Sequence, residues 1–156
     1  MNGQTLLDIR HQNTAIVHGT CVAVEGRGAL VVGPSGSGKS ALALQMMAYG
    51  AALVADDRVA LSMVDGAAIA DAVPTLRGVI EARGVGLLRA RTAGATPVCY
   101  VVDLDQSEPA RLPEPVNTVV LRQTVPLLRA AGIPNLSAIL MQLLKMGRLD
   151  PEWPST

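Results

Sequence analysis

Runs of apolar residues separated by short turns predict a β-hairpin at the start of the chain. Residues 15–24 and 29–32 are rich in Val, Ile, Ala and Leu, and they are separated around residues 26–28, where glycine stands at both ends. A connection this short forces neighbouring strands to pair antiparallel. We therefore expect two antiparallel strands before residue 33.

The next stretch changes to the composition of a helix. Residues 39–49 are good helix formers, with Leu42, Met46 and Met47 on an apolar side. Gly50 follows, where helices often end in a left-handed residue. The pattern predicts a helix of about three turns.

A strand and a second hairpin are predicted after this helix. Residues 51–55 form a short apolar strand that ends at Asp56 and Asp57. Residues 59–72 contain Asp65-Gly66, a strong two-residue hairpin signal, between two apolar runs.

The second half of the chain predicts further strands and one clear amphipathic helix. Residues 105–115 contain acidic residues, serine and three prolines, so we expect a surface loop there. We expect a brief helix at 75–82, strands at 85–88, 98–104 and 116–121, a helix at 136–146 and a tail at 151–156. The pattern leaves residues 126–131 undecided.

Composition indicates one globular domain, residues 1–156. The chain is 49% hydrophobic and 17% charged, with 13 basic and 13 acidic residues. This is enough apolar material for a core and too little charge for a disordered chain. The zero net charge argues against a nucleic-acid partner, as does the shortage of aromatic residues on which bases could stack.

We expect a cytoplasmic protein that does not enter a membrane. The uncharged stretch 41–55 is too short to cross a bilayer, and Asp8 and Arg10 stand where a signal peptide would need an apolar run. Cys21 and Cys99 lack the spacing of a metal site, so we interpret both as buried thiols in a reducing compartment.

One motif carries a specific chemical meaning. The eight residues Gly33, Pro34, Ser35, Gly36, Ser37, Gly38, Lys39 and Ser40 match the phosphate-loop pattern. An apolar strand leads in and a helix leads out, so backbone N–H groups can surround a phosphate. Lys39 would then reach the β and γ phosphates and Ser40 would bind Mg²⁺. The alternative is a Gly/Ser-rich turn that binds no ligand.

An acidic pair follows the phosphate loop at a distance in sequence that could bring it back to the phosphates. Asp56 and Asp57 come at the predicted end of a strand about one helix length after Lys39. One carboxylate could hold Mg²⁺, and a second, on the other side of the strand end, could accept a proton from an incoming hydroxyl. The alternative is a pair that only caps a turn.

These motifs together resemble the catalytic domain of HPr kinase/phosphorylase. His18-Gly19, the phosphate loop, LVADDRV at 53–59 and IEARGVG at 80–86 occur in the family's order, and the resemblance covers about residues 17–88. It implies an α/β fold, a P-loop kinase domain with a mixed, largely antiparallel sheet like that of phosphoenolpyruvate carboxykinase. The chain resembles a short form that consists of the C-terminal catalytic domain only.

The resemblance also implies roles for individual residues. Asp56 would be the base that accepts the proton of a serine hydroxyl. Asp57 would assist with Mg²⁺, and Glu81 would bind Mg²⁺ together with Ser40. His18 would lie beside the phosphates and hold Asp56 or the transferring group by a hydrogen bond. Without the family, Glu81 and Arg83 would be an exposed helix end and His18 a satisfied strand residue.

The chain departs from the longer relatives in its loop at 105–115, which is short. Arg111 is the only basic residue there, and we match it to the family's catalytic arginine; the alternative is a solvated loop charge. Residues 125–132 resemble only loosely the segment linked to dephosphorylation, so the kinase direction is better supported than the phosphorylase direction.

The sequence thus predicts a Mg²⁺-dependent, ATP-using kinase of a serine on a phosphocarrier protein of the phosphotransferase system, HPr or its nitrogen-related paralogue. The family also implies a homo-oligomer, since it forms hexamers. Two alternatives stay open: a small-molecule P-loop kinase or NTPase, and a nucleotide-responsive module without catalysis. The sequence does not decide between ATP, GTP and pyrophosphate as donor.

Overall fold

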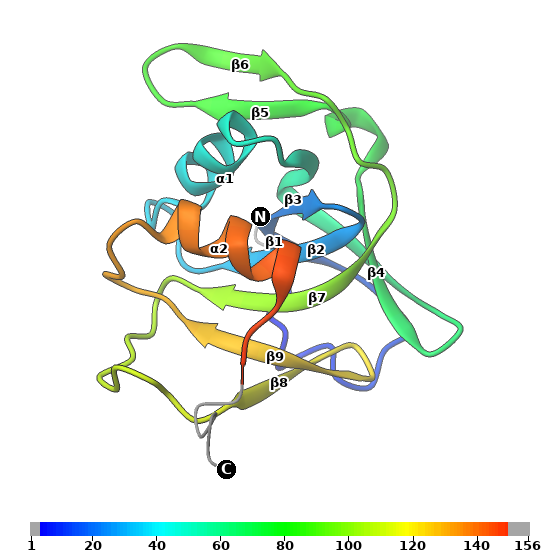
Figure 1. Cartoon of the computed structure of the whole chain (residues 1–156). Coiled ribbons are helices and arrows are strands. Elements are labelled where there is room, and N and C mark those ends of the chain that lie inside the picture. The colour runs from blue at the N-terminus through cyan, green and yellow to red at the C-terminus, as the bar shows by residue number, and fades with distance from the viewer. Residues whose placement is uncertain (1–3, 150–156) are drawn as a thin grey trace.

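The computed structural model describes residues 4–149 and has an α/β architecture (Figure 1). Its elements are β1 (Thr14–Val24), β2 (Arg27–Val32), α1 (Lys39–Ala48), β3 (Ala52–Val64), β4 (Ala67–Ala72), the 3-10 turn η1 (Pro74–Leu76), β5 (Val79–Ala82), β6 (Gly86–Arg89), β7 (Thr96–Asp103), β8 (Val116–Val120), β9 (Gln123–Arg129) and α2 (Leu136–Met146). The expected tail at 151–156 lies outside the described residues.

The main sheet is mixed and largely antiparallel, as predicted. Its seven strands follow the order β2-β1-β3-β4-β7-β9-β8, and β2 also pairs with β7. Among the paired strands within residues 4–149, only the β2–β7 and β7–β9 pairs are parallel. The extra pairing closes β1, β2, β3, β4 and β7 into a ring, so these strands enclose side chains as a small barrel does.

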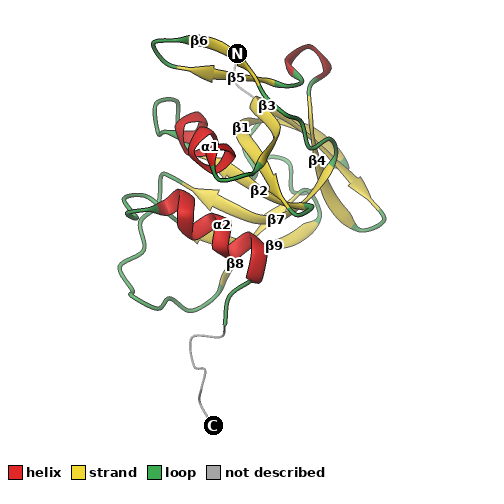
Figure 2. Ribbon diagram, turned by 45° about the horizontal axis from the view of Figure 1, so that its top comes forward, coloured by secondary structure: helices red, strands yellow, loops and turns green. Residues whose placement is uncertain are grey.

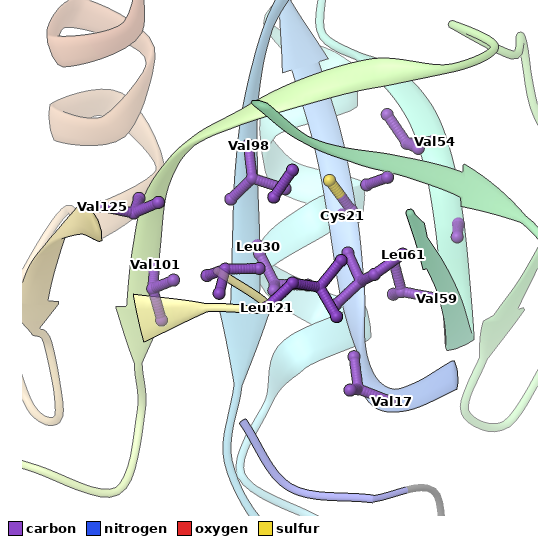
Figure 3. Packing of buried hydrophobic residues seen from close by; sticks show 14 of the residues in the cluster. Val17, Cys21, Leu30, Val54, Val59, Leu61, Val98, Val101, Leu121 and Val125 are labelled. Carbon is purple, nitrogen blue, oxygen red and sulfur yellow. The ribbon is translucent and has the colours of Figure 1, made fainter. Parts of the chain in front are cut away.

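Two cores follow from the alternation of side chains along these strands. On β1 and β2, Cys21 and Leu30 point into the ring, among Val59, Leu61 and Leu121 (Figure 3). Their neighbours in sequence point outward and form a second core with α1 and α2. Both helices lie on the same side of the sheet (Figure 2). This packing holds the start of α1 against the end of β2.

The structure confirms both predicted hairpins and both long helices. The expectation at 75–82 is wrong: a 3-10 turn is followed by β5, which pairs antiparallel with β6 as a separate two-stranded sheet. Gly78 has a φ of 71°, which breaks a helix, and the backbone groups of β5 instead bond across to β6. The undecided residues 126–129 belong to β9, paired with both β7 and β8.

A second correction concerns the acidic pair. Asp56 and Asp57 do not end a strand, because β3 runs without interruption from Ala52 to Val64. β1 pairs with β3 through this region, with Thr20 opposite Asp56 and Gly19 opposite Asp57. The pair therefore lies in the middle of a strand, where the hydrogen-bonded pairing of β1 with β3 fixes its neighbours.

Within residues 4–149, no helix is long and apolar enough to span a membrane.

The two cysteines are expected to differ strongly in reactivity. Cys21 is fully buried in the ring, as expected, and burial raises the pKa of its thiol to about 12. The expectation of a buried thiol is wrong for Cys99, which is half-buried on β7. At pH 8 only about one in ten thousand Cys21 thiols would be ionised. Iodoacetamide should therefore label Cys99 alone in the folded protein, as read by peptide mass mapping. Equal labelling rates at both cysteines would contradict this packing, and Cys99→Ser provides the unlabelled control.

Candidate active site

The phosphate-loop residues form a tight turn between β2 and α1. Gly33, Gly36 and Gly38 have φ values of 151°, 84° and 97°, which side chains rarely permit. Gly38 is the residue before the first turn of α1, so the helix N-terminus opens at the loop. The Ser37 hydroxyl is buried and has no hydrogen-bond partner within the described part of the chain. The loop thus has the backbone of an anion site.

Lys39 is held inside this loop. Its side chain is buried, and Nζ donates to the carbonyl oxygens of Gly33 at 2.8 Å and Pro34 at 3.0 Å. Burial lowers the pKa of Lys39, while the charges of Asp56 and Asp57 act in the opposite direction. The ammonium is therefore fixed in direction and poorly solvated, which strengthens its attraction for an anion.

Asp56 is the most tightly held carboxylate of the site. It is 6% exposed. Oδ1 accepts hydrogen bonds from the hydroxyls of Ser40 at 2.7 Å and Thr20 at 2.9 Å, and Oδ2 accepts one from the backbone N–H of Glu81 at 3.2 Å. Three elements, β1, α1 and β5, thus fix its orientation beside the phosphate loop.

Asp57 reaches the same cleft through an unusual backbone conformation. In a regular strand, adjacent side chains point to opposite faces. Asp57 has a φ of 70°, uncommon for a residue other than glycine. As a result Asp56 and Asp57 both line one cleft, contrary to the expectation that they lie on opposite sides. The Asp57 side chain is 64% exposed, and its Oδ1 lies 3.5 Å from Nδ1 of His18. Within the described residues His18 therefore faces Asp57, and the implied hydrogen bond from His18 to Asp56 is not formed, because Asp56 is held by Thr20, Ser40 and the Glu81 N–H.

The cleft between the loop and these carboxylates has a volume of about 380 Å³. It brings together most of the residues named from the sequence: His18, Ser35, Gly36, Gly38, Lys39, Ser40, Asp56, Asp57 and Glu81. Arg111 is exposed on the loop after β7 and does not line this cleft. Its catalytic role stays a prediction.

Two further polar residues line the cleft. Thr20 is buried and donates to Asp56; it follows His18 by two positions on β1 and so shares its face. Because 15–24 is predicted as a strand, the sequence alone places Thr20 on the same face as His18. Arg83 also lines the cleft, at the turn that joins β5 and β6. Its position depends on the antiparallel pairing of β5 with β6. The expectation of a helix at 75–82 does not predict this pairing.

The oxygen ligands in the cleft suit Mg²⁺. Mg²⁺ is commonly held by one or two carboxylates together with substrate phosphates and water. The cleft offers Asp56, Asp57, the Glu81 carboxylate and the Ser40 hydroxyl. Among residues 4–149, no three His, Cys, Asp or Glu side chains already form a closed metal site. A metal bound here would therefore complete its coordination with water or with oxygen atoms of a bound phosphate.

Comparisons with known proteins identify the family of this chain. Residues 10–99 match the family model described as HPr Serine kinase C-terminal domain. The HPr kinase/phosphorylase of Aromatoleum aromaticum is 33% identical over 155 residues, covering 86% of this chain and 50% of that protein. That of Brevibacillus brevis is 35% identical over 116 residues, covering 69% of this chain and 37% of that protein. The chain thus spans half or less of the length of these relatives.

A solved structure has the same fold. The Hpr(Ser) kinase/phosphatase of Coxiella burnetii aligns with a TM-score of 0.71 and 22% identity, over 83% of this chain and 88% of that one. With the family match spanning the phosphate loop, both aspartates and Glu81, the chain belongs to the family of the HPr serine kinase C-terminal domain.

Proposed function

We propose that this protein is a Mg²⁺-dependent phosphoryl transferase that moves the terminal phosphate of ATP to a serine of HPr or its nitrogen-related paralogue. The observation that carries the proposal is the placement of Asp56. Its carboxylate lies 2.7 Å from the Ser40 hydroxyl of the phosphate loop and in the wall of an open cleft. A base at this position can reach a hydroxyl that approaches the phosphates.

Each side chain then has a distinct task. The loop N–H groups and Lys39 bind the phosphates and stabilise the charge that develops on them. Asp56 accepts the proton as the serine oxygen attacks the γ phosphorus, the bond from this phosphorus to the bridging oxygen breaks, and ADP leaves. Thr20 and the Glu81 N–H keep Asp56 in position. Mg²⁺, held by Ser40, Asp57 and Glu81, would supply charge neutralisation between the phosphates. His18 orients Asp57.

The test is incubation with ATP labelled on its γ phosphate and purified HPr or its paralogue. Label on the carrier serine supports the proposal. Label on a small molecule would support the alternative P-loop kinase, and binding without transfer would support a regulatory module. The open cleft favours a protein acceptor, because the described residues contain no inserted lid that would enclose a small one.

Several further points belong to the same proposal. We place the protein in the cytoplasm, where the phosphotransferase system works.

The reverse, phosphorylase reaction would use Asp56 as an acid, by microscopic reversibility. Arg111 and a homo-oligomeric assembly stay predictions from the family resemblance.

The Glu81→Gln variant tests the metal role. It keeps the shape of the side chain and the backbone N–H that donates to Asp56, but it removes one negative charge from the cleft. The Mg²⁺ concentration for half-maximal transfer should rise about tenfold. Glu114→Gln, an exposed glutamate outside the cleft, should leave the Mg²⁺ titration unchanged. An unaltered titration for Glu81→Gln would place this side chain outside the metal site.

A further inference from the structure

A groove lined mainly by aliphatic side chains lies between α2 and the strands β8 and β9 (Figure 1). Its volume is about 400 Å³. Ile133 and Ile139 line it and are 36% and 47% exposed. The other aliphatic residues along it are Val116, Leu127, Leu128, Leu136, Leu140 and Leu143. At its rim Glu108 and Arg129 lie 3.6 Å apart and offset each other's charge. The groove therefore favours an apolar occupant over water.

The chain leaves α2 at one end of this groove. Gly147 ends the helix with a φ of 78°, and Gly147 and Arg148 both line the groove. The sequence continues as DPEWPST, residues 150–156, which lie outside the described residues. Trp153 stands five residues after Arg148, a reach of about 17 Å for an extended chain. Since α2 is itself about 16 Å long, Trp153 can reach any part of the groove.

The composition of this segment suits the groove. Trp153 is the only tryptophan of the chain, and an indole ring can bury about 150–250 Å² of surface. Pro151 and Pro154 restrict the backbone on both sides of it, which lowers the entropy cost of ordering the segment. The short tether also keeps Trp153 near the groove at an effective concentration of about the millimolar range. A second molecule would therefore compete poorly for the same place.

We propose that the segment 150–156 docks in this groove, with the Trp153 ring between α2 and β9. Pro113 and Glu114, from the loop 105–115, line the same groove. The Glu114 carboxylate thus offers an acceptor for the indole N–H, and the docked ring would hold this loop against α2. The inference does not depend on the proposed transfer reaction.

The experiment uses the fluorescence of the full chain. Because Trp153 is the only tryptophan, selectively excited emission reports this residue alone. We expect emission at shorter wavelengths than from a synthetic peptide of residues 150–156. Quenching by acrylamide should be about threefold slower or more, since a docked group typically has about 70–90% of its surface covered. Neither value should change with protein concentration.

Two variants of α2 locate the ring. Ile139→Lys places a charge in the groove at a helix position that is already partly exposed. The matched control is Met146→Lys, because Met146 is 76% exposed on the same helix and lines a different hollow. Ile139→Lys should bring emission and quenching to the values of the peptide, and Met146→Lys should leave both unchanged. Thermal unfolding reports whether each variant folds.

A third variant leaves α2 as it is. Trp153→Ala should open the groove and increase the binding of the apolar dye anilinonaphthalene sulfonate. The inference is overturned by peptide-like emission in the parental chain, by an equal response of both lysine variants, or by unchanged dye binding in Trp153→Ala. Emission that depends on protein concentration would assign the ring to the groove of a second copy and would overturn it as well.

Discussion

Replacing Lys39 with alanine should abolish measurable phosphoryl transfer, with a loss of at least about 10² to 10³ in rate. Lys39 is buried in the phosphate loop, and its ammonium is held by the carbonyls of Gly33 and Pro34. Removing this charge takes away both an attraction for bound phosphate and the stabilisation of charge that develops during transfer. Nucleotide affinity should fall as well.

The chain provides a matched control for this prediction. Lys145 is the only other lysine, and it is exposed on α2. Lys145→Ala should keep both transfer and nucleotide binding at parental values. Labelled-phosphate transfer and calorimetry measure the two effects separately. Parental transfer by Lys39→Ala would show that the loop does not bind the reacting phosphates.

The Asp56→Asn variant should separate binding from chemistry. Asparagine keeps the volume of the side chain but cannot accept a proton. Transfer to serine should fall by about 10² to 10⁴, roughly 3–5 kcal/mol of barrier, while nucleotide binding survives. One oxygen of the new amide can still accept from Thr20 and Ser40, which both donate to Oδ1.

The Asp56→Asn substitution should also lower the free energy of unfolding. The amide NH₂ would face the backbone N–H of Glu81, which now donates to Oδ2. An unpaired donor of this kind costs about 1–3 kcal/mol, visible in thermal unfolding. Asp65→Asn, at an exposed turn with a φ of 50°, controls for the loss of charge. An Asp56→Asn protein that transfers at the parental rate would remove Asp56 from the role of base.

Asp57→Asn completes the comparison. Asp57 is exposed and lies near His18. Replacing its carboxylate should lower the affinity for Mg²⁺, so part of the lost transfer activity should return at high metal concentration. Rescue of Asp56→Asn by Mg²⁺, without rescue of Asp57→Asn, would reverse the two assignments.

Local signals in the chain were sufficient for much of the fold. Gly26, Asp65-Gly66 and Gly50 mark turns and a helix end, and the structure has each where the pattern predicts it. The phosphate loop was recognisable because its glycines and its lysine act through neighbours close in sequence. The helix expected at residues 75–82 is nevertheless wrong. Residues 79–82 form a strand because they pair with β6, and this pairing outweighs the helix propensity of the segment.

The sequence by itself determined the phosphate loop, the acidic pair and the alternation that forms the hairpins, since each depends on residues near one another in the chain. Only the tertiary structure decided how they meet. The β1–β3 register sets Thr20 opposite Asp56, the left-handed conformation at Asp57 turns both carboxylates into one cleft, and closure of the ring holds the loop beside them. These are long-range contacts, and their geometry follows from packing of the whole sheet, which no local pattern specifies.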